Sequence, residues 1–263
     1  MKAFAALRRA RLQLLMAGQL ENWREAWKAY ASASAMPPLR FKNGLVLHSR
    51  AGDSAGFLFF EIFANGCYGR GLPAPLRGEV VDIGANIGAF TLQAAWRYPG
   101  SVIHAYEPDP QTCLTLRRNV EANGLASRVR IWNEAVAGVA GTLRLWRGEG
   151  SVIASAHLAD AARGEACDVP AVTLQTVLSR TGGRIGLLKM DCEGAEGDVF
   201  ESAGAALDAV DCIVAEYHEG LVPGVLARMR AALEPSFVVA AADTRRCGPM
   251  MRARRRTPIE STV

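Results

Sequence analysis

Carboxylate side chains end four short apolar segments of the sequence. The four acids are Asp82, Glu107, Asp191 and Glu216, which close residues 79–82, 101–107, 185–191 and 209–216. If these segments are parallel strands, their carboxyl ends share one edge of a sheet, where ligands bind. His218 follows two residues after the last acid, and its ordinary pKa near neutrality suits it to accept a proton. The pattern indicates a site for a cationic ligand beside a proton acceptor.

A glycine-containing loop follows the first of these acids. Its sequence is VDIGANIG, with Asn86 standing where a dinucleotide-binding loop has a glycine between Gly84 and Gly88. A dinucleotide would bring a pyrophosphate to this loop, and Asp82 would repel it. S-adenosylmethionine carries a sulfonium and an ammonium group, which a carboxylate attracts. The loop therefore favours S-adenosylmethionine, with Glu107 placed to accept hydrogen bonds from the ribose hydroxyls.

A parallel sheet is needed to bring these residues together. From residue 78 onward, short apolar segments alternate with segments of helical periodicity, which is typical of an α/β fold with a mostly parallel central sheet and helices on both faces. We expect strands at residues 79–82, 101–107, 129–133, 185–190, 209–216 and 237–241, and helices at residues 89–97, 110–123, 195–202 and 222–233. Residues 142–146 and 169–174 are expected to form strands outside the alternating series.

Four ordered motifs carry a family resemblance. VVDIGANIGAF, HAYEPDP, LLKMDCEGAE and VAEYHEG, preceded by EIFANGCYGRG, resemble the FkbM-type S-adenosylmethionine-dependent methyltransferases. The resemblance runs from about residue 57 to residue 237. It implies a Rossmann-like class I methyltransferase fold. It also implies O-methylation of a hydroxyl on a sugar, a polyketide or another natural-product small molecule, as in many members of the family.

The resemblance also implies roles for individual residues. Cofactor contacts are expected from Asp82, Gly84, Asn86, Gly88, Glu107, Pro108, Glu134, Ala135 and Asp191. Among them, Glu107 would hold the ribose and Pro108 would shape the turn beside the adenine. Glu134 and Ala135 fall where a further adenine contact is expected. Glu193 matches the family's signature after the strand that ends at Asp191.

An alcohol acceptor must lose a proton during methyl transfer, which requires a base or a metal ion. We expect His218 to be the catalytic base, with Asp191 sharing this role or orienting the hydroxyl. Tyr68, Glu193, Glu216 and His218 are the expected substrate-side residues. A Mg²⁺ ion held by Asp191, Glu193 and Glu216 is an alternative that the sequence does not favour. Residues 148–157 are a candidate lid over the acceptor.

Charge divides the chain into three parts. Residues 1–30 hold six basic and two acidic side chains, and residues 245–263 hold six arginines and one glutamate, which leaves the middle at −5 in a chain of net charge +4. We expect an N-terminal helical extension or cap over residues 1–40, an S-adenosylmethionine-dependent methyltransferase domain over residues 41–244 and a basic tail over residues 245–263. The terminal segments are candidates for homo-oligomer contacts, surface anchors or solvated tails.

Other functions are weaker interpretations of the sequence. An RNA methyltransferase could use the basic termini, but the acidic middle disfavours a nucleic-acid partner. A nicotinamide-dependent oxidoreductase would be expected to carry a tighter glycine motif and a Tyr-x-x-x-Lys pair, and the chain has neither. A binding module without catalysis would have no need for the strand-end acids.

The cysteine and hydropathy patterns bear on location. The six cysteines show no metal-binding spacing, so we expect free thiols and a reducing, cytoplasmic environment. No apolar run reaches the length of about 18 residues that is needed to span a bilayer. The expected partner is thus a small hydroxylated molecule met in the cytoplasm.

Overall fold

The computed structural model describes residues 2–51, 53, 55–69, 71–72, 75–147, 154–155, 166–244 and 246–256. Side chains are described for the same residues except 2–8, 147 and 154–155. Apart from residues 154–155, the candidate lid at residues 148–157 lies outside this set.

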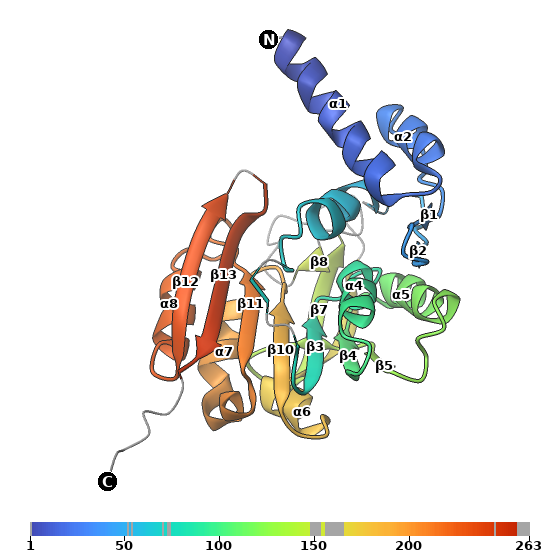
Figure 1. The fold of residues 1–263 in the computed structure, drawn as a ribbon. Coiled ribbons are helices and arrows are strands. Elements are labelled where there is room, and N and C mark those ends of the chain that lie inside the picture. The colour runs from blue at the N-terminus through green and yellow to red at the C-terminus, as the bar shows by residue number, and fades with distance from the viewer. Residues whose placement is uncertain are drawn as a thin grey trace.

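A seven-stranded, mostly parallel sheet forms the centre of the molecule (Figure 1). Its order is β12 (Phe237–Thr244), β13 (Gly248–Arg255), β11 (Cys212–Glu216), β10 (Ile185–Met190), β3 (Glu79–Ile83), β4 (Ile103–Tyr106) and β5 (Val129–Trp132). The five strands from β11 to β5 run parallel to one another. Every residue of β10 is buried, as expected for a parallel strand that is covered on both faces. The predicted α/β fold is confirmed.

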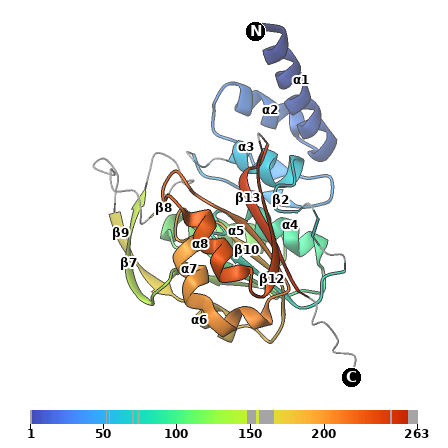
Figure 2. The same ribbon diagram turned by 90° about the vertical axis from the view of Figure 1, so that its left-hand side faces the viewer.

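Helices cover both faces of this sheet (Figures 1 and 2). One group contains α4 (Ala89–Arg97) and α5 (Pro110–Ala122), and the other contains α6 (Leu174–Ser179), α7 (Glu196–Ala203) and α8 (Val225–Leu233), with the 3₁₀-helix η2 (Gly204–Ala209). Adjacent side chains of a strand point to opposite faces, so Val80 packs in the core beside α4 and Val81 in the core beside α7. Asp109 caps α5 by accepting hydrogen bonds from the backbone of Gln111 and Thr112, at 2.7 and 3.1 Å.

A smaller sheet stands beside the central one. It contains β6 (Ala135–Val136), β9 (Ala166–Val172), β7 (Gly141–Arg147) and β8 (Ala154–Ser155), in that order. Its inner side buries Leu145 and Val169 in a core of its own. The strand expected at residues 142–146 falls within β7. The strand expected at residues 169–174 is confirmed only as far as Val172, because Thr173 caps α6 and Leu174 begins it.

The N-terminal part lies over the carboxyl ends of the parallel strands (Figure 1). It contains α1 (Lys2–Gln19), α2 (Trp23–Ala31), the strand pair β1 (Leu39–Arg40) and β2 (Val46–Leu47), α3 (Ala55–Leu58) and the π-helix η1 (Phe59–Ala64). Met16 and Leu20 are fully buried in the same core as Phe59, so the helical extension packs on the domain. Asn22 fixes the entry to α2, because its side chain bonds the carbonyl of Pro38 and the amide of Arg40.

The C-terminal residues correct the expectation of a basic tail. Residues 248–255 form β13, which pairs antiparallel with both β11 and β12 inside the central sheet. Met251 and Ala253 are buried, while Arg252 and Arg255 donate hydrogen bonds to the backbone carbonyls of Cys67 and Leu207. These arginines therefore serve packing, which weakens the argument for a nucleic-acid footprint at this end.

A disulfide corrects the expectation that every cysteine is free. Cys67, just after η1, is bonded to Cys247 in the turn between β12 and β13, with the two Cα atoms 5.2 Å apart. The other four cysteines, Cys113, Cys167, Cys192 and Cys212, lie outside this disulfide. Because disulfides persist in oxidising compartments, the cysteine pattern no longer supports a cytoplasmic location.

Candidate active site

A small cavity of about 110 Å³ lies at the carboxyl ends of β3, β10 and β11. Its walls come from the loop after β3, the start of α4, the segments that follow β10 and β11, and η1 with the residues around it. Seven residues predicted for the site line this cavity: Tyr68, Gly84, Asn86, Asp191, Glu193, Glu216 and His218. The expectation that strand-end groups meet at one edge is therefore met for β10 and β11.

Close approach of two strand ends explains the first glycine of the loop. Gly84 has a φ of +70°, and a Cβ atom at this position would lie 1.7 Å from the carbonyl oxygen of Asp191. Only glycine fits this backbone without displacing its neighbour. Gly84 thus allows the loop to pass directly beside Asp191, which brings the expected cofactor loop and the residues expected to be catalytic into one cavity.

Asp82 is placed differently from its expected contact with the cofactor. Its side chain is fully buried, accepts a hydrogen bond from Thr91 at 2.6 Å and lies 3.3 Å from Nζ of Lys189. Lys189 in turn donates to the carbonyl oxygen of Gly84 at 2.6 Å. Burial alone would lower the pKa of Lys189, but the charges of Asp82 and Asp191 outweigh it and raise that pKa. Asp82 therefore acts on the loop through a charged lysine.

Glu107 stabilises the same loop by accepting hydrogen bonds from backbone amides. One of its carboxylate oxygens accepts from the amide of Asn86 at 2.8 Å and the other from the amide of Asp109 at 2.9 Å. Burial raises the pKa of Glu107 to about 7, although both amide bonds oppose this shift. Asn133 holds the following turn, since its side chain donates to the carbonyls of Glu107 and Pro108. Ribose binding by Glu107 remains a prediction, because this carboxylate does not line the cavity.

Four further predicted cofactor residues also lie outside the cavity lining: Gly88, Pro108, Glu134 and Ala135. Glu134 forms an ion pair with Arg180 at 2.5 Å, and the Arg180 guanidinium lies 4.1 Å from the ring centroid of Trp132. Ala135 is buried in β6. The adenine contacts expected of these residues stay predictions.

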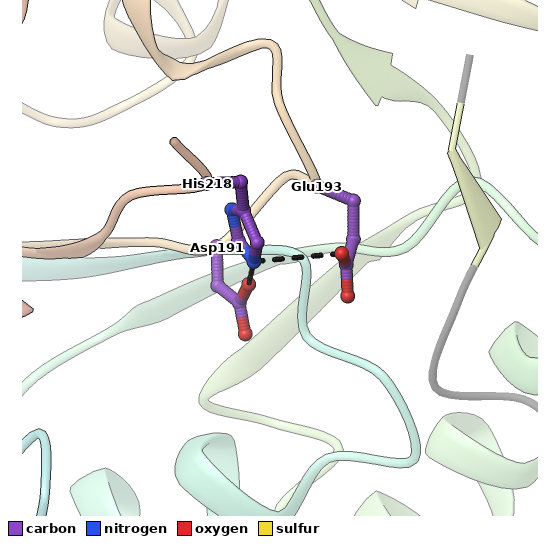
Figure 3. A group of neighbouring side chains, drawn as sticks. All are labelled: Asp191, Glu193 and His218. Carbon is purple, nitrogen blue, oxygen red and sulfur yellow. Dashed lines mark ion pairs between the residues drawn. The ribbon is translucent and has the colours of Figure 1, made fainter. Parts of the chain in front are cut away.

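His218 is held between three carboxylates. Its Nδ1 is 2.9 Å from Oε1 of Glu196, which is fully buried, and its Nε2 is 3.4 Å from Glu193 and 3.9 Å from Asp191. Figure 3 shows Nε2 directed towards these last two carboxylates. Burial would lower the pKa of His218, but the hydrogen bond to Glu196 and the negative charges outweigh it and raise the pKa to about 9. The imidazole is thus fixed in orientation, with Nε2 in the cavity.

Tyr68 joins two of the strand-end acids. Its hydroxyl oxygen is 3.0 Å from Oδ2 of Asp191 and 2.9 Å from Oε2 of Glu216, and its side chain is 1% exposed. A hydroxyl has one hydrogen, so it satisfies both contacts best when a carboxyl carries a proton and donates to the phenol oxygen. Burial and the charge of Asp191 raise the pKa of Glu216 to about 7, which fits this arrangement.

Glu61 of η1 is a site residue that the sequence reasoning missed. It lines the cavity, and burial followed by the charges of Asp191 and Glu216 raises its pKa to about 8. The signal was a single acid within the apolar run FFEIFA. Burial and the charge of Asp191 likewise raise the pKa of Glu193 to about 7. Several carboxyl groups with raised pKa values in one cavity favour a cationic ligand there.

A metal ion is the second kind of cation that this cavity could hold. One donor atom from each of Asp191, Glu193 and His218 lies within 4.8 Å of the others. This set differs from the expected oxygen cage, because the histidine takes the place of Glu216, whose carboxylate contacts Tyr68. Two carboxylates and one imidazole are ligands that suit a divalent transition metal.

The family of the chain follows from its central region. A model of the family described as "Methyltransferase FkbM domain" matches residues 82–237. The chain belongs to the FkbM methyltransferase family. It is thus an S-adenosylmethionine-dependent methyltransferase, and the resemblance of its four motifs is confirmed.

Several proteins are similar to this FkbM methyltransferase. A protein named 31-O-demethyl-FK506 methyltransferase FkbM, from Streptomyces tacrolimicus, is 33% identical over 228 residues, covering 74% of this chain and 86% of the relative. Methyltransferase sdnD from Sordaria araneosa is 38% identical over 91 residues, which is 35% of each chain. The crystal structure of a methyltransferase FkbM from Methylobacillus flagellatus covers 94% of this chain and 59% of its own, with a TM-score of 0.50 and 14% identity. This likeness supports the class I methyltransferase fold.

The cavity residues fit the cofactor of the FkbM family. The sulfonium and ammonium groups of S-adenosylmethionine are cationic, and the cavity gathers carboxyl groups whose pKa values are raised by burial and by one another. Gly84, Ala85 and Asn86 of the loop after β3 line this cavity together with these acids. In the part of the chain that the structure describes, no helix is both long enough and apolar enough to cross a membrane.

Proposed function

We propose that this methyltransferase methylates a hydroxyl group of a sugar or another natural-product small molecule, with His218 as the base that takes up the hydroxyl proton. The observation that carries the proposal is the fixed imidazole. Its Nδ1 is bonded to buried Glu196, while Nε2 faces Asp191 and Glu193, which line the cavity (Figure 3). A hydroxyl acceptor also agrees with the name of the Streptomyces relative, a 31-O-demethyl-FK506 methyltransferase.

The cofactor would be held by the loop after β3 and by the acids of the cavity. Backbone groups from Gly84 to Asn86 would line its amino-acid part, while Glu61, Asp191 and Glu193 would neutralise its cationic groups. When bound, S-adenosylmethionine supplies a methyl group that the sulfonium has already activated. The protein then has two tasks, which are to align the acceptor hydroxyl and to remove its proton.

The electrostatic surroundings of His218 suit the second task. Its pKa of about 9 shows that the imidazolium formed by proton uptake is stabilised by the adjacent carboxylates. A cation bound nearby lowers this pKa, because like charges disfavour the protonated ring. Binding of the donor would thus move His218 towards its neutral, proton-accepting form. Asp191 lies 3.9 Å from Nε2 and would orient the acceptor hydroxyl.

The cofactor assignment is tested by calorimetric titration with S-adenosylmethionine, S-adenosylhomocysteine and NAD. We expect both sulfur compounds to bind with a stoichiometry of one and NAD to give no heat. NAD binding without binding of the sulfur compounds would overturn the proposal. An acceptor screen with isotope-labelled donor, read by mass spectrometry, then identifies the methylated molecule and the accepting atom.

A further inference from the structure

A second cavity, of about 510 Å³, opens beside the first. The two share Phe57, Glu61 and Glu216 in their walls, so they are adjacent at η1 and the end of β11. The outer walls of the larger cavity come from α1, α2 and the turn between β12 and β13. We call this larger cavity the outer chamber.

We propose that the outer chamber binds the methyl acceptor, and that it selects a hydroxylated molecule with an apolar body and an anionic group. This inference rests on the proposed function, because it assigns the substrate side of the same site. The shared residues place the inner end of the chamber against the cavity that contains His218. An acceptor in the chamber would reach the base and the bound donor past Phe57, Glu61 and Glu216.

Apolar side chains line much of the chamber. Leu12 and Leu15 of α1 face Phe60 of η1, with Tyr30 of α2 and Phe57 of α3 beside them. Phe57 is 56% exposed and Tyr30 is 37% exposed, although both belong to the chamber wall. Aromatic surface left open in a concave site is typical of a pocket that binds an apolar ligand.

Two arginines give the chamber its charge preference. Arg11 comes from α1 and Arg246 from the β12–β13 turn, so the chamber is lined by one cation from each end of the chain. Both are exposed, and among the described residues neither forms an ion pair. Guanidinium groups bind carboxylate, sulfate or phosphate groups by charge-assisted hydrogen bonds. An anionic group on the acceptor would therefore anchor it here.

Covalent and polar links hold this wall in place. The Cys67–Cys247 disulfide ties the β12–β13 turn to the segment that follows η1. Asn65 adds a hydrogen bond of 3.4 Å to the carbonyl of Arg246. Of the described residues that line the chamber, only Glu216 falls within the family match at residues 82–237. Acceptor choice is thus assigned to segments outside the region that defines the family.

A matched pair of fluorescent dyes tests the chamber without knowledge of the acceptor. Anilinonaphthalene sulfonate has an apolar body and an anionic group, and N-phenylnaphthylamine has the same apolar rings without the charge. Both are titrated into the 263-residue protein saturated with S-adenosylhomocysteine. We expect Arg11→Gln and Arg246→Gln each to weaken binding of the sulfonate about tenfold and to leave the neutral dye within twofold.

Two controls complete the dye experiment. Arg118→Gln removes an exposed arginine from α5, and this arginine lines neither cavity. We expect this variant to bind both dyes with the affinity of the wild type. Leu15→Asp places a charge in the apolar wall and is expected to weaken the binding of both dyes. Unchanged S-adenosylhomocysteine binding shows that each variant is folded.

The outcomes separate the two proposals. Absence of S-adenosylhomocysteine binding by the wild-type protein removes the proposed function and the acceptor role with it. If that compound binds but the sulfonate does not, or if the two arginine variants bind the sulfonate as tightly as the wild type, the outer chamber is not the acceptor site.

Discussion

Nδ1 of His218 and Oε1 of Glu196 lie 2.9 Å apart, and the glutamate is fully buried. Glu196 is itself fixed by the backbone amides of Cys192 and Gly194, at 3.1 to 3.2 Å. The pair therefore joins the start of α7 to the segment that follows β11. It sets both the orientation of the imidazole and its affinity for a proton.

Replacing the buried carboxylate should change the pH dependence of methyl transfer. Glu196→Gln keeps a hydrogen-bonding group but removes the charge that raises the pKa of His218. The base is active when neutral, so activity rises as pH rises through this pKa. The rising limb of kcat/KM, near pH 9 in the wild type, should move down by roughly 1 to 2 pH units. A limb that stays in place, as it should in the exposed control Glu121→Gln, would contradict the pairing.

Glu61 should make the protein less stable at alkaline pH. Its pKa is about 8 in the folded protein and near 4.5 in the unfolded chain, so the folded state binds the extra proton between these values. The free energy of unfolding therefore falls as pH rises across this range. Glu61→Gln should raise the Tm by about 2–4 °C at pH 8.5 and leave it unchanged at pH 5, as measured by thermal unfolding. An equal change in Tm at both pH values would mean that ionisation of Glu61 does not lower the free energy of unfolding.

The Cys67–Cys247 disulfide should contribute measurably to stability. It closes a loop with a sequence separation of 180 residues, and loss of a native disulfide typically costs about 2–5 kcal/mol. Cys67→Ser, Cys247→Ser and reductant should each lower the Tm to a similar value, and reductant should not lower it further in either variant. Alkylation of the denatured, unreduced protein should label four of the six cysteines. Labelling of all six would refute the bond.

Chelation distinguishes two roles of His218, which are that of a proton acceptor and that of a ligand to a metal ion. If His218 acts as the base, incubation with EDTA followed by gel filtration should leave the turnover rate unchanged within twofold. A metal ion at Asp191, Glu193 and His218 would be removed by this treatment, and activity would return on addition of Mn²⁺ or Mg²⁺. Loss of activity with recovery on metal addition would reassign Nε2 from proton acceptor to metal ligand.

The sequence predicted which residues follow the ends of the parallel strands better than it predicted the contacts of their side chains. Asp191, Glu216 and His218 could be placed together because parallel strands end at a common edge, whatever the details of packing. Asp82 and Glu107 sit at the same edge, yet they turn inward to Lys189 and to loop amides. The direction in which a side chain turns depends on partners from other elements, which spacing along the chain does not specify.

Long-range pairings account for most of what the sequence did not reveal. Cys67 and Cys247 meet only because the β12–β13 turn reaches back to the segment after η1. The arginines of β13 concealed an alternating strand pattern, in which Met251 and Ala253 are buried. Glu61 was hidden in an aromatic run that forms core and cavity wall together.

Substitution of His218 tests the central claim most directly. Once an acceptor is identified, methyl transfer by His218→Gln is compared with that of the wild type, with S-adenosylhomocysteine affinity as the control for folding. We expect kcat to fall at least about 100-fold, while the Kd of S-adenosylhomocysteine changes by no more than about threefold. A variant that keeps its kcat and its pH profile would contradict the assignment of His218 as the base.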